Sequence, residues 1–150
     1  HVDAGVEISE GICRRLRFSS EDTEQISALV SHHMKFKDAE QMRTATLKRF
    51  VRLPRFEEHL ALHRLDSLSS NRRLEAYDFV SRFIAETPAE EVRPQRLLNG
   101  DDLVRMGYRP GPLFSEILSA LEDAQLDGQI DNLADAESFV KQHYPTLQEQ

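Results

Sequence analysis

The sequence predicts an all-α fold, a helical array of about seven to eight helices in two subdomains. Apolar residues recur at intervals of three and four through most of the 150 residues, as in amphipathic helices. No stretch shows the strict two-residue alternation that is typical of a half-buried strand. Prolines and glycines interrupt the apolar pattern at Pro54, at residues 107–112 and at Gly128, which divides the chain into separate helices.

The composition is that of a globular protein and excludes several classes. Hydrophobic residues make up 39% of the chain and charged residues 30%, which does not fit a disordered protein. The single cysteine, Cys13, excludes an internal disulfide, so a reducing cytoplasm is the expected location. No apolar run approaches the roughly 18 to 20 residues that cross a bilayer, so no membrane partner is expected.

The chain begins at His1 rather than at a methionine, inside what reads as a running helix. We therefore expect a fragment of a longer protein. A helix truncated at this point could leave an apolar face open to pairing, which keeps a homodimer among the expected states.

Five helices are expected in the first subdomain, residues 1–86. Their expected spans are residues 2–17, 20–34, 40–53, 55–69 and 73–85. Ser19 or Ser20 can cap the second helix, and Asp22 follows Ser19 by three residues in the manner of a capping box. Pro54 breaks the third helix and can open the fourth, because a proline in the first turn loses no helical hydrogen bond.

A linker is expected over residues 87–96, where two prolines interrupt the helical pattern. The second subdomain, residues 97–150, follows it. Three helices are expected there: a short one around Leu103, a longer one that begins at Pro112, and a last one over about 134–143.

The segment between the first two of these helices is a tight corner. Residues 107–112 hold two glycines and two prolines, so they cannot be helical, and Gly128 supplies the stop of the helix that follows. A helix that starts after such a corner exposes unpaired N–H groups and the positive end of its dipole, and Arg109 lies close by. The corner is therefore a candidate phosphate site. The alternative is a joint between two helices that only packs.

Charge is segregated along the chain. The net charge of −7 argues, taken whole, against a nucleic-acid partner. Residues 35–73, however, hold ten bases and five acids, whereas residues 113–150 hold eight acids and one base, Lys141. A basic middle beside an acidic tail is compatible with RNA on one face of the protein.

Four basic residues in the middle of the chain are candidate phosphate contacts: Lys48, Arg49, Arg52 and Arg55. Lys48 and Arg52 share a helical face, and Arg55 extends this face across the break at Pro54. The alternative is a solvated helix face that acidic neighbours partly neutralise.

Three groups of side chains could bind a divalent cation: His1, the pair His32 and His33, and the set His59, His63 and Asp66. The last set is spaced i, i+4 and i+7, which places it along one helical face. Histidines and a carboxylate at such spacing can hold a metal ion, and the alternative is core histidines with backbone partners. No nucleophile elbow, Walker loop or dinucleotide-binding glycine pattern is present, so by its own residues this chain is not obviously an enzyme.

Two long runs resemble a known family. The runs are TLKRFVRLPRFEEHLALHRLDSLSS, residues 46–70, and LLNGDDLVRMGYRPGPLFSEILSALEDAQLDG, residues 97–128. They are similar to the C-terminal part of bacterial tRNA nucleotidyltransferases, the CCA-adding enzymes and their poly(A) polymerase relatives, and the similarity spans nearly the whole chain. The resemblance implies a modular enzyme. Its head would carry catalytic carboxylates and bind Mg²⁺ and ATP or CTP, and its helical neck, body and tail would hold the tRNA.

This chain contains neither the head nor the nucleotide-selecting motif of the neck, so the resemblance assigns no catalytic residue and no cofactor to it. What the resemblance implies is an RNA-binding remainder, inactive alone, that positions the RNA 3′ end for the absent head. The implied RNA contacts are Lys48, Arg49, Arg52, Arg55, Arg109, Gly111 and Pro112. Whether the parent adds CCA, CC, A or a poly(A) tail stays open.

The first subdomain also resembles the end of an HD-type phosphohydrolase domain. The residues that fall at metal-ligand positions of such domains are His1, His32, His33 and Asp66. The eponymous His-Asp dyad would lie upstream of His1, so weak or no binding of a divalent metal is expected. Two alternatives to RNA binding follow: a remnant of a metal-dependent phosphohydrolase, or a purely structural module for self-association.

Overall fold

The structure is a computed structural model that describes residues 2–70 and 72–146. Over these residues the chain forms α-helices and one 3₁₀ helix and contains no strand, which confirms the predicted all-α class. The chain divides into two compact units. Unit 1 comprises His1–Met42 and Phe50–Thr87, and unit 2 comprises Arg43–Arg49 and Pro88–Gln150.

This division differs from the predicted boundaries at two points. Residues 43–49, expected in the first subdomain, belong to unit 2, so the boundary falls inside helix α3 (Thr44–Val51). The expected linker, residues 87–96, contains the short helix α6 (Ala89–Val92), which is part of unit 2. The functional roles given to the two subdomains stay predictions.

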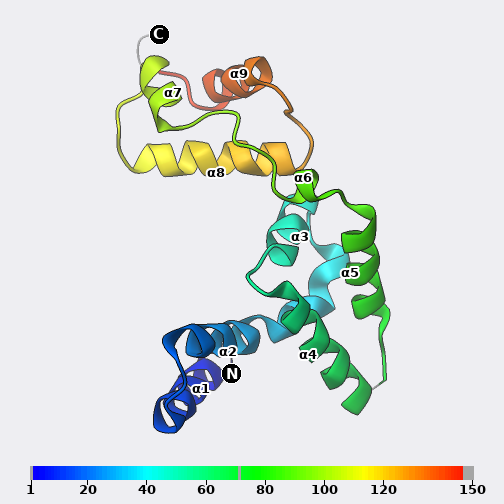
Figure 1. The fold of residues 1–150 in the computed structure, drawn as a ribbon. Helices are drawn as coiled ribbons and strands as arrows, with labels where there is room; N and C mark the ends of the chain where they lie inside the picture. The colour runs from blue at the N-terminus through cyan, green and yellow to red at the C-terminus, as the bar shows by residue number, and fades with distance from the viewer. Residues whose placement is uncertain (1, 71, 147–150) are drawn as a thin grey trace. The chain divides into compact units, whose positions relative to one another are not determined.

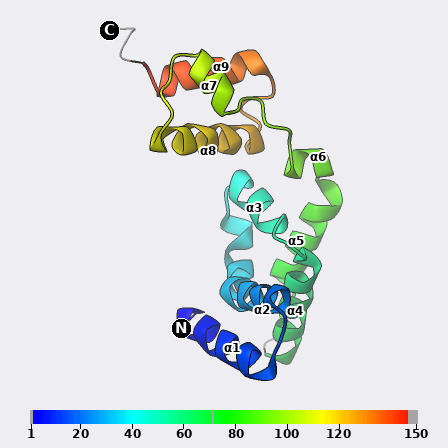
Figure 2. The ribbon, with the colours of Figure 1, turned by 60° about the vertical axis from the view of Figure 1, so that its left-hand side comes forward.

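Unit 1 begins with a pair of helices, α1 (Val2–Leu16) and α2 (Ser20–His32), which lie side by side (Figures 1 and 2). The Ser19 hydroxyl accepts a hydrogen bond from the Asp22 N–H at 3.0 Å, so the predicted cap of the second helix is confirmed at Ser19. Three exposed apolar side chains lie along one face of α1: Ile8, Ile12 and Leu16. The homodimer that such a face would allow stays a prediction.

A 3₁₀ helix, η1 (His33–Gln41), replaces the expected ends of two α-helices. The prediction that one α-helix runs to residue 34 and another starts at residue 40 is therefore wrong. Residues three apart share a face in a 3₁₀ helix, and Phe36 and Ala39 are both 0% exposed. Phe36 and Ala39 therefore enter the core of unit 1 from one face of η1.

The core of unit 1 is aromatic. Phe36 packs against Phe50 and Phe56 with ring centroids 5.0 and 5.9 Å apart, and His63 stacks on Phe36 at 4.4 Å. Helix α4 (Phe56–Ser69) supplies two of these four rings. Because α3 ends at Val51 and α4 begins at Phe56, the predicted break around Pro54 is confirmed. Helix α5 (Glu75–Glu86) completes the unit and packs against η1.

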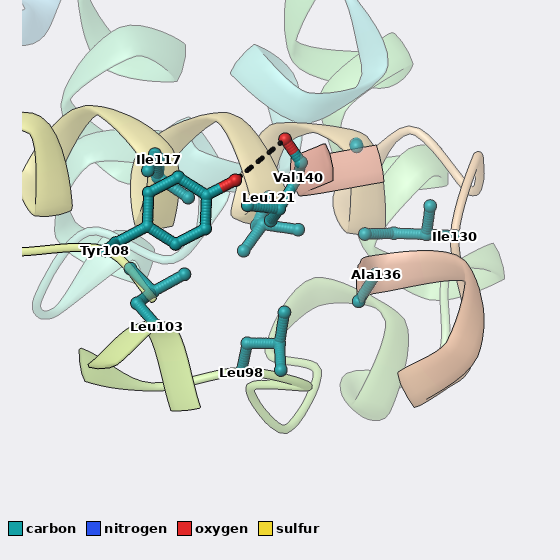
Figure 3. Packing of buried hydrophobic residues seen from close by; sticks show 9 residues of the cluster. Leu98, Leu103, Tyr108, Ile117, Leu121, Ile130, Ala136 and Val140 are labelled. Carbon is teal, nitrogen blue, oxygen red and sulfur yellow. Dashed lines mark hydrogen bonds between the residues drawn. The ribbon is translucent and has the colours of Figure 1, made fainter. Parts of the chain in front are cut away.

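Unit 2 is built on the long helix α8 (Pro112–Leu126), with α7 (Gly100–Arg105) and α9 (Leu133–His143) packed on the same side of it in both views (Figures 1 and 2). A single apolar cluster fills the space between them. Its buried members are Leu98, Leu103, Tyr108, Ile117, Leu121, Ala124, Ile130, Ala136 and Val140. Figure 3 shows the Tyr108 ring with Leu103 and Ile117 on either side of it.

The ends of α8 follow the predicted signals. Pro112 occupies the first turn, and Gly128 has a φ of +72°, a left-handed conformation that glycine adopts without strain. The Gly128 N–H donates to the Gln125 carbonyl and the Gln129 N–H to the Ala124 carbonyl, at 3.1 and 2.8 Å. These bonds close the helix in a Schellman motif, so the predicted start and stop are both confirmed.

Candidate nucleic-acid interface

The predicted corner borders a cavity of about 510 Å³ that lies wholly within unit 2. We call it the corner cavity. Its lining residues are Gly107, Tyr108, Arg109, Leu113, Tyr144, Pro145 and Thr146. The corner between α7 and α8 thus meets the segment that follows α9, more than thirty residues later, and the two segments form the walls together.

Backbone geometry fixes the corner wall of the cavity. Gly107 has a φ of +94°, so this turn favours glycine. The Gly107 N–H donates to the Val104 carbonyl and the Tyr108 N–H to the Leu103 carbonyl, each at 3.0 Å. These bonds close the end of α7 and aim the Tyr108 ring into the apolar cluster.

Tyr108 joins the two walls. Its ring is buried, and its hydroxyl donates a hydrogen bond of 2.6 Å to the Tyr144 carbonyl. A longer hydrogen bond of 3.5 Å joins the same hydroxyl to the Val140 carbonyl (Figure 3). A buried hydroxyl needs such partners, because leaving it unpaired would cost about 1 to 3 kcal/mol. The Tyr108 phenol is therefore committed to holding the end of α9 against the corner.

Tyr144 forms the other aromatic wall, and its ring is half-buried. Burial raises the pKa of the Tyr144 phenol, and the charge of Glu116 and a hydrogen bond with its carboxylate raise that pKa further. The phenol of Tyr144 therefore stays neutral at neutral pH.

Arg109 is the cation at the cavity, and its side chain is exposed to solvent. The N-terminus of α8 lies beside it: no side chain caps this helix at Gly111, and Pro112 has no N–H to offer. The backbone of Gly111 is extended, with a φ of 167°, and a Cβ there would meet nothing within 4 Å. The corner is thus open to solvent on the side that carries Arg109.

The predicted phosphate contacts at Lys48 and Arg49 have partners inside unit 2. The Lys48 ammonium is buried, donates to the Leu126 carbonyl at 3.1 Å and lies 3.4 Å from a Glu91 carboxylate oxygen. The Arg49 guanidinium forms ion pairs with two carboxylates of α8, Glu122 at 2.8 Å and Asp123 at 2.9 Å. Contact with RNA stays a prediction for both residues, but the structure gives each an internal role.

Asp127 completes this polar joint. Its carboxylate accepts hydrogen bonds from the Arg43 guanidinium at 2.6 Å and from the Ala45 N–H at 2.8 Å. Burial works to raise the pKa of Asp127, but these two hydrogen bonds and the positive charge of Arg43 outweigh it and lower the pKa. Bases from the middle of the chain, Arg43 and Arg49, therefore form ion pairs with carboxylates of the acidic C-terminal part.

The two predicted RNA-contact regions of unit 2 are not adjacent. Lys48 bonds to Leu126 at the end of α8, whereas Arg109 precedes the start of α8 at Pro112. The two ends of α8 are fourteen residue steps apart, a span of roughly 21 Å at 1.5 Å per step. The structure brings Arg109, Gly111 and Pro112 together at the corner, and it holds Lys48 and Arg49 at the opposite end of the helix.

The remaining two basic candidates, Arg52 and Arg55, belong to unit 1. Arg55 precedes α4 in a left-handed conformation, with a φ of +50°, and its Nε donates to a Glu58 carboxylate oxygen at 2.8 Å. Arg52 is half-buried. RNA contact stays a prediction at both positions.

Of the predicted metal set, His33 and Asp66 line one small pocket in the part of the chain that the structure describes, together with His63. Nδ1 of His32 lies 2.8 Å from the Ala28 carbonyl, and Nδ1 of His33 lies 2.6 Å from the Val30 carbonyl. Asp66 is exposed, and His1 lies outside the described residues. Over the described chain, no three histidine, cysteine, aspartate or glutamate side chains form a group that could hold a metal ion.

Two further histidines of the predicted metal-capable group belong to the core of unit 1. His59 is only 2% exposed, and neither ring nitrogen has a hydrogen-bond partner; Nε2 of His63 also lacks one. Burial lowers the pKa of both rings, and the neighbouring His32 lowers that of His59 further. These rings are neutral components of an aromatic core at neutral pH.

Comparison with known proteins places this geometry in context. No family model matches the sequence, and no solved structure matches it. Among curated proteins, the CC-adding tRNA nucleotidyltransferase of a Synechocystis species is 24% identical over 144 residues. The A-adding tRNA nucleotidyltransferase of Deinococcus radiodurans is 28% identical over 151 residues, and the A-adding enzyme of Halalkalibacterium halodurans is 44% identical over 50 residues.

The curated homologues of this chain are tRNA nucleotidyltransferases. The first two matches each cover 94% of this chain but only 34% of the relative, and the third covers 33% of this chain and 12% of the relative. The chain therefore spans about a third of the length of the tRNA nucleotidyltransferases it matches. The family resemblance inferred from the two sequence runs is confirmed, and the coverage is consistent with the expected C-terminal part.

The sequence did not single out Tyr144, which lines the corner cavity. Its neighbour Pro145 signals only the end of the last helix, and nothing local indicates that residues 144–146 return to the corner.

No helix in the described part of the chain has both the length and the apolar character needed to span a membrane.

Proposed function

We propose that this chain is an RNA-binding part of a tRNA nucleotidyltransferase, and that it positions the RNA 3′ end for a catalytic head supplied by the whole protein. The observation that carries the proposal is the extent of the match: nearly the whole chain aligns with enzymes whose names give tRNA as their substrate. Nucleotidyl transfer, with Mg²⁺ and ATP or CTP, belongs to the whole protein in this proposal.

The corner supports the proposal as the point of RNA contact. Arg109 is solvent-exposed there, beside the uncapped N-terminus of α8, and both features favour a phosphate group. Contacts of this kind orient an RNA without reading its sequence, which suits a protein part that must accept the common shape of many tRNAs. No step of the transfer reaction is assigned to residues of this chain.

Binding of a tRNA transcript that lacks its 3′-terminal CCA tests the proposal. Fluorescence anisotropy at about 50 mM salt should give saturable binding to the chain, in the micromolar range or weaker that is typical of contacts with the backbone alone. Arg109→Glu should weaken binding about 10-fold. Arg14→Glu on the exposed surface of α1 makes the same change in net charge and serves as the matched control.

The control variant should bind tRNA within about 2-fold of the unmodified chain. Absence of tRNA binding to the unmodified chain would contradict the proposal. Equal losses in the two variants would show that only net charge matters and would remove the corner from it.

A further inference from the structure

The corner cavity has the size and lining of a small-ligand site. Its volume of about 510 Å³ falls within the roughly 300 to 1,000 Å³ of typical ligand pockets. Its lining includes the tyrosines Tyr108 and Tyr144, Leu113 and Pro145, and Arg109 is the one charged residue among the described residues that line it. An aromatic wall with a single cation suits a planar, aromatic ligand that carries a negative charge nearby.

The charge of unit 2 argues for the same kind of ligand. Residues 88–150 hold twelve acids and five lysines or arginines. The bases that residues 43–49 add to the unit, Arg43, Lys48 and Arg49, form ion pairs with its carboxylates. A surface of this kind cannot follow a long phosphate chain, which requires many basic contacts. Stacking of a base on an aromatic ring needs no such field.

Hydrogen bonds fix the backbone of Tyr144 on both sides of the residue. The Tyr144 N–H donates to the Val140 carbonyl at 2.8 Å, and its carbonyl accepts from the Tyr108 hydroxyl at 2.6 Å. A fixed backbone beneath the ring reduces the conformational freedom that is lost on binding, so more of the stacking energy remains as affinity.

We propose that the corner cavity receives the base of one unpaired RNA nucleotide, stacked on Tyr144 with its phosphate at Arg109. This inference rests on the proposed RNA-binding function and adds a ligand to it. Binding through one base and one phosphate depends weakly on salt: the logarithm of the affinity for a single strand should fall with a slope of about −0.7 against the logarithm of salt concentration, rather than several times that value.

The test uses the full chain and a fluorescein-labelled single-stranded RNA hexamer, with an abasic copy of the hexamer as second probe. Tyr144→Ala should weaken hexamer binding about 10-fold, since base–aromatic stacking is worth about that much. Tyr144→Phe keeps the ring and should bind within about 2-fold of the unmodified chain. The abasic hexamer should lose part of its affinity for the unmodified chain and none when Tyr144 is already alanine.

A second measurement does not depend on any variant folding. Cytidine and adenosine monophosphates, added to the unmodified chain, should shift the amide NMR signals of Gly107, Arg109 and Tyr144. Unchanged corner signals, or equal hexamer binding by the folded alanine variant and the unmodified chain, would overturn the inference.

The outcomes for the two proposals are separable. If tRNA binds but Tyr144→Ala has no effect, the base pocket is refuted and the RNA-binding function stands. If the mononucleotides shift the corner signals but tRNA does not bind, the pocket stands and the RNA-binding function is refuted.

Discussion

The two units handle left-handed backbone positions in different ways. Unit 1 places arginine at all three of its described positive-φ positions, Arg17, Arg55 and Arg72, with φ between 50° and 59°. Unit 2 places glycine at both of its described left-handed positions, Gly107 and Gly128. A residue with a Cβ pays roughly 1 to 2 kcal/mol for this conformation, whereas glycine adopts it freely. Unit 1 therefore holds backbone strain that unit 2 avoids.

The units also differ in how they treat buried polar atoms. The buried side-chain atoms without a hydrogen-bond partner in the described chain are Nδ1 and Nε2 of His59, Nε2 of His63 and Oγ of Ser81, and all of them belong to unit 1. In unit 2 the buried Lys48 ammonium and the Tyr108 hydroxyl both have partners. An unpartnered buried polar atom costs about 1 to 3 kcal/mol.

This comparison indicates unequal local stability. Strain and unpaired polar atoms lower the free energy needed to open unit 1, whereas unit 2 lacks both among its described residues. We expect unit 1 to open first on denaturation and unit 2, with the corner cavity, to stay folded longer. A preformed aromatic wall in the more stable unit is what a rigid binding site requires.

The largest effect should come from the core of unit 2. Leu103→Ala removes a fully buried side chain and should lower the free energy of unfolding by about 2 to 5 kcal/mol, enough to make unit 2 the first to open. Amide hydrogen exchange read residue by residue measures the order of opening. Leu133→Ala, at an exposed position of α9, is the control and should change stability by less than about 0.5 kcal/mol. Unit 2 opening first already in the unmodified chain would contradict the comparison.

The polar joint of unit 2 should show a smaller effect that depends on burial. Lys48→Met keeps the apolar stem and leaves the Leu126 carbonyl without its donor, so a loss of about 1 to 3 kcal/mol is expected. Arg49→Met breaks partly exposed ion pairs and should cost less than about 1 kcal/mol. Urea denaturation followed by tyrosine fluorescence measures both losses. Equal losses would mean that burial does not set the contribution of these bases.

Opposite signs are expected for a matched pair of glycine substitutions. Gly107→Ala meets no atom within 4 Å but must adopt a φ of +94°, so unit 2 should lose about 1 kcal/mol. Arg17→Gly relieves a φ of +58° and should stabilise α1. The gain should be only about 0.5 kcal/mol, because glycine also increases the conformational freedom of the unfolded chain, which opposes folding. Thermal melts of the two variants give the signs. The same sign in both would refute the assignment of strain to unit 1.

The smallest effect expected at neutral pH is that of the buried histidines on the stability of unit 1, and this effect should grow as the pH falls. Burial lowers the pKa of His59 and His63 below 6.5 in the folded chain, although the acidic Glu57, Glu58 and Asp66 oppose this. The unfolded chain then binds more protons than the folded chain below pH 6.5, so the stability of unit 1 should fall from there toward the lowered pKa values. His59→Leu removes one of these groups and should flatten the decline, which denaturation across pH 5 to 7.5 would measure. A steeper decline in unit 2 would contradict this account.

Local signals in the sequence predicted most of the helices because their causes are local. Ser19, Pro112 and Gly128 each set a helix end through bonds within a few residues. The 3₁₀ turn over His33–Gln41 escaped the prediction because a core, not a propensity, selects it by burying Phe36 and Ala39. Propensity is a weak guide where tertiary packing decides.

The candidate site divides in the same way. Arg109 and the corner were found from residue types at one place in the sequence, whereas the Tyr144 wall depends on a hydrogen bond across 36 residues. Lys48 was predicted as a surface cation, but its partner Leu126 lies 78 residues away, so no local pattern could reveal its burial.

One measurement tests the central claim most directly: the amide NMR shifts of the full chain on titration with a tRNA that lacks its 3′-terminal CCA. We predict that the largest shifts fall at residues 107–113 and 144–146, where Arg109 and the other described lining residues of the cavity lie. Saturable binding that leaves these signals unchanged and moves others instead would contradict the account.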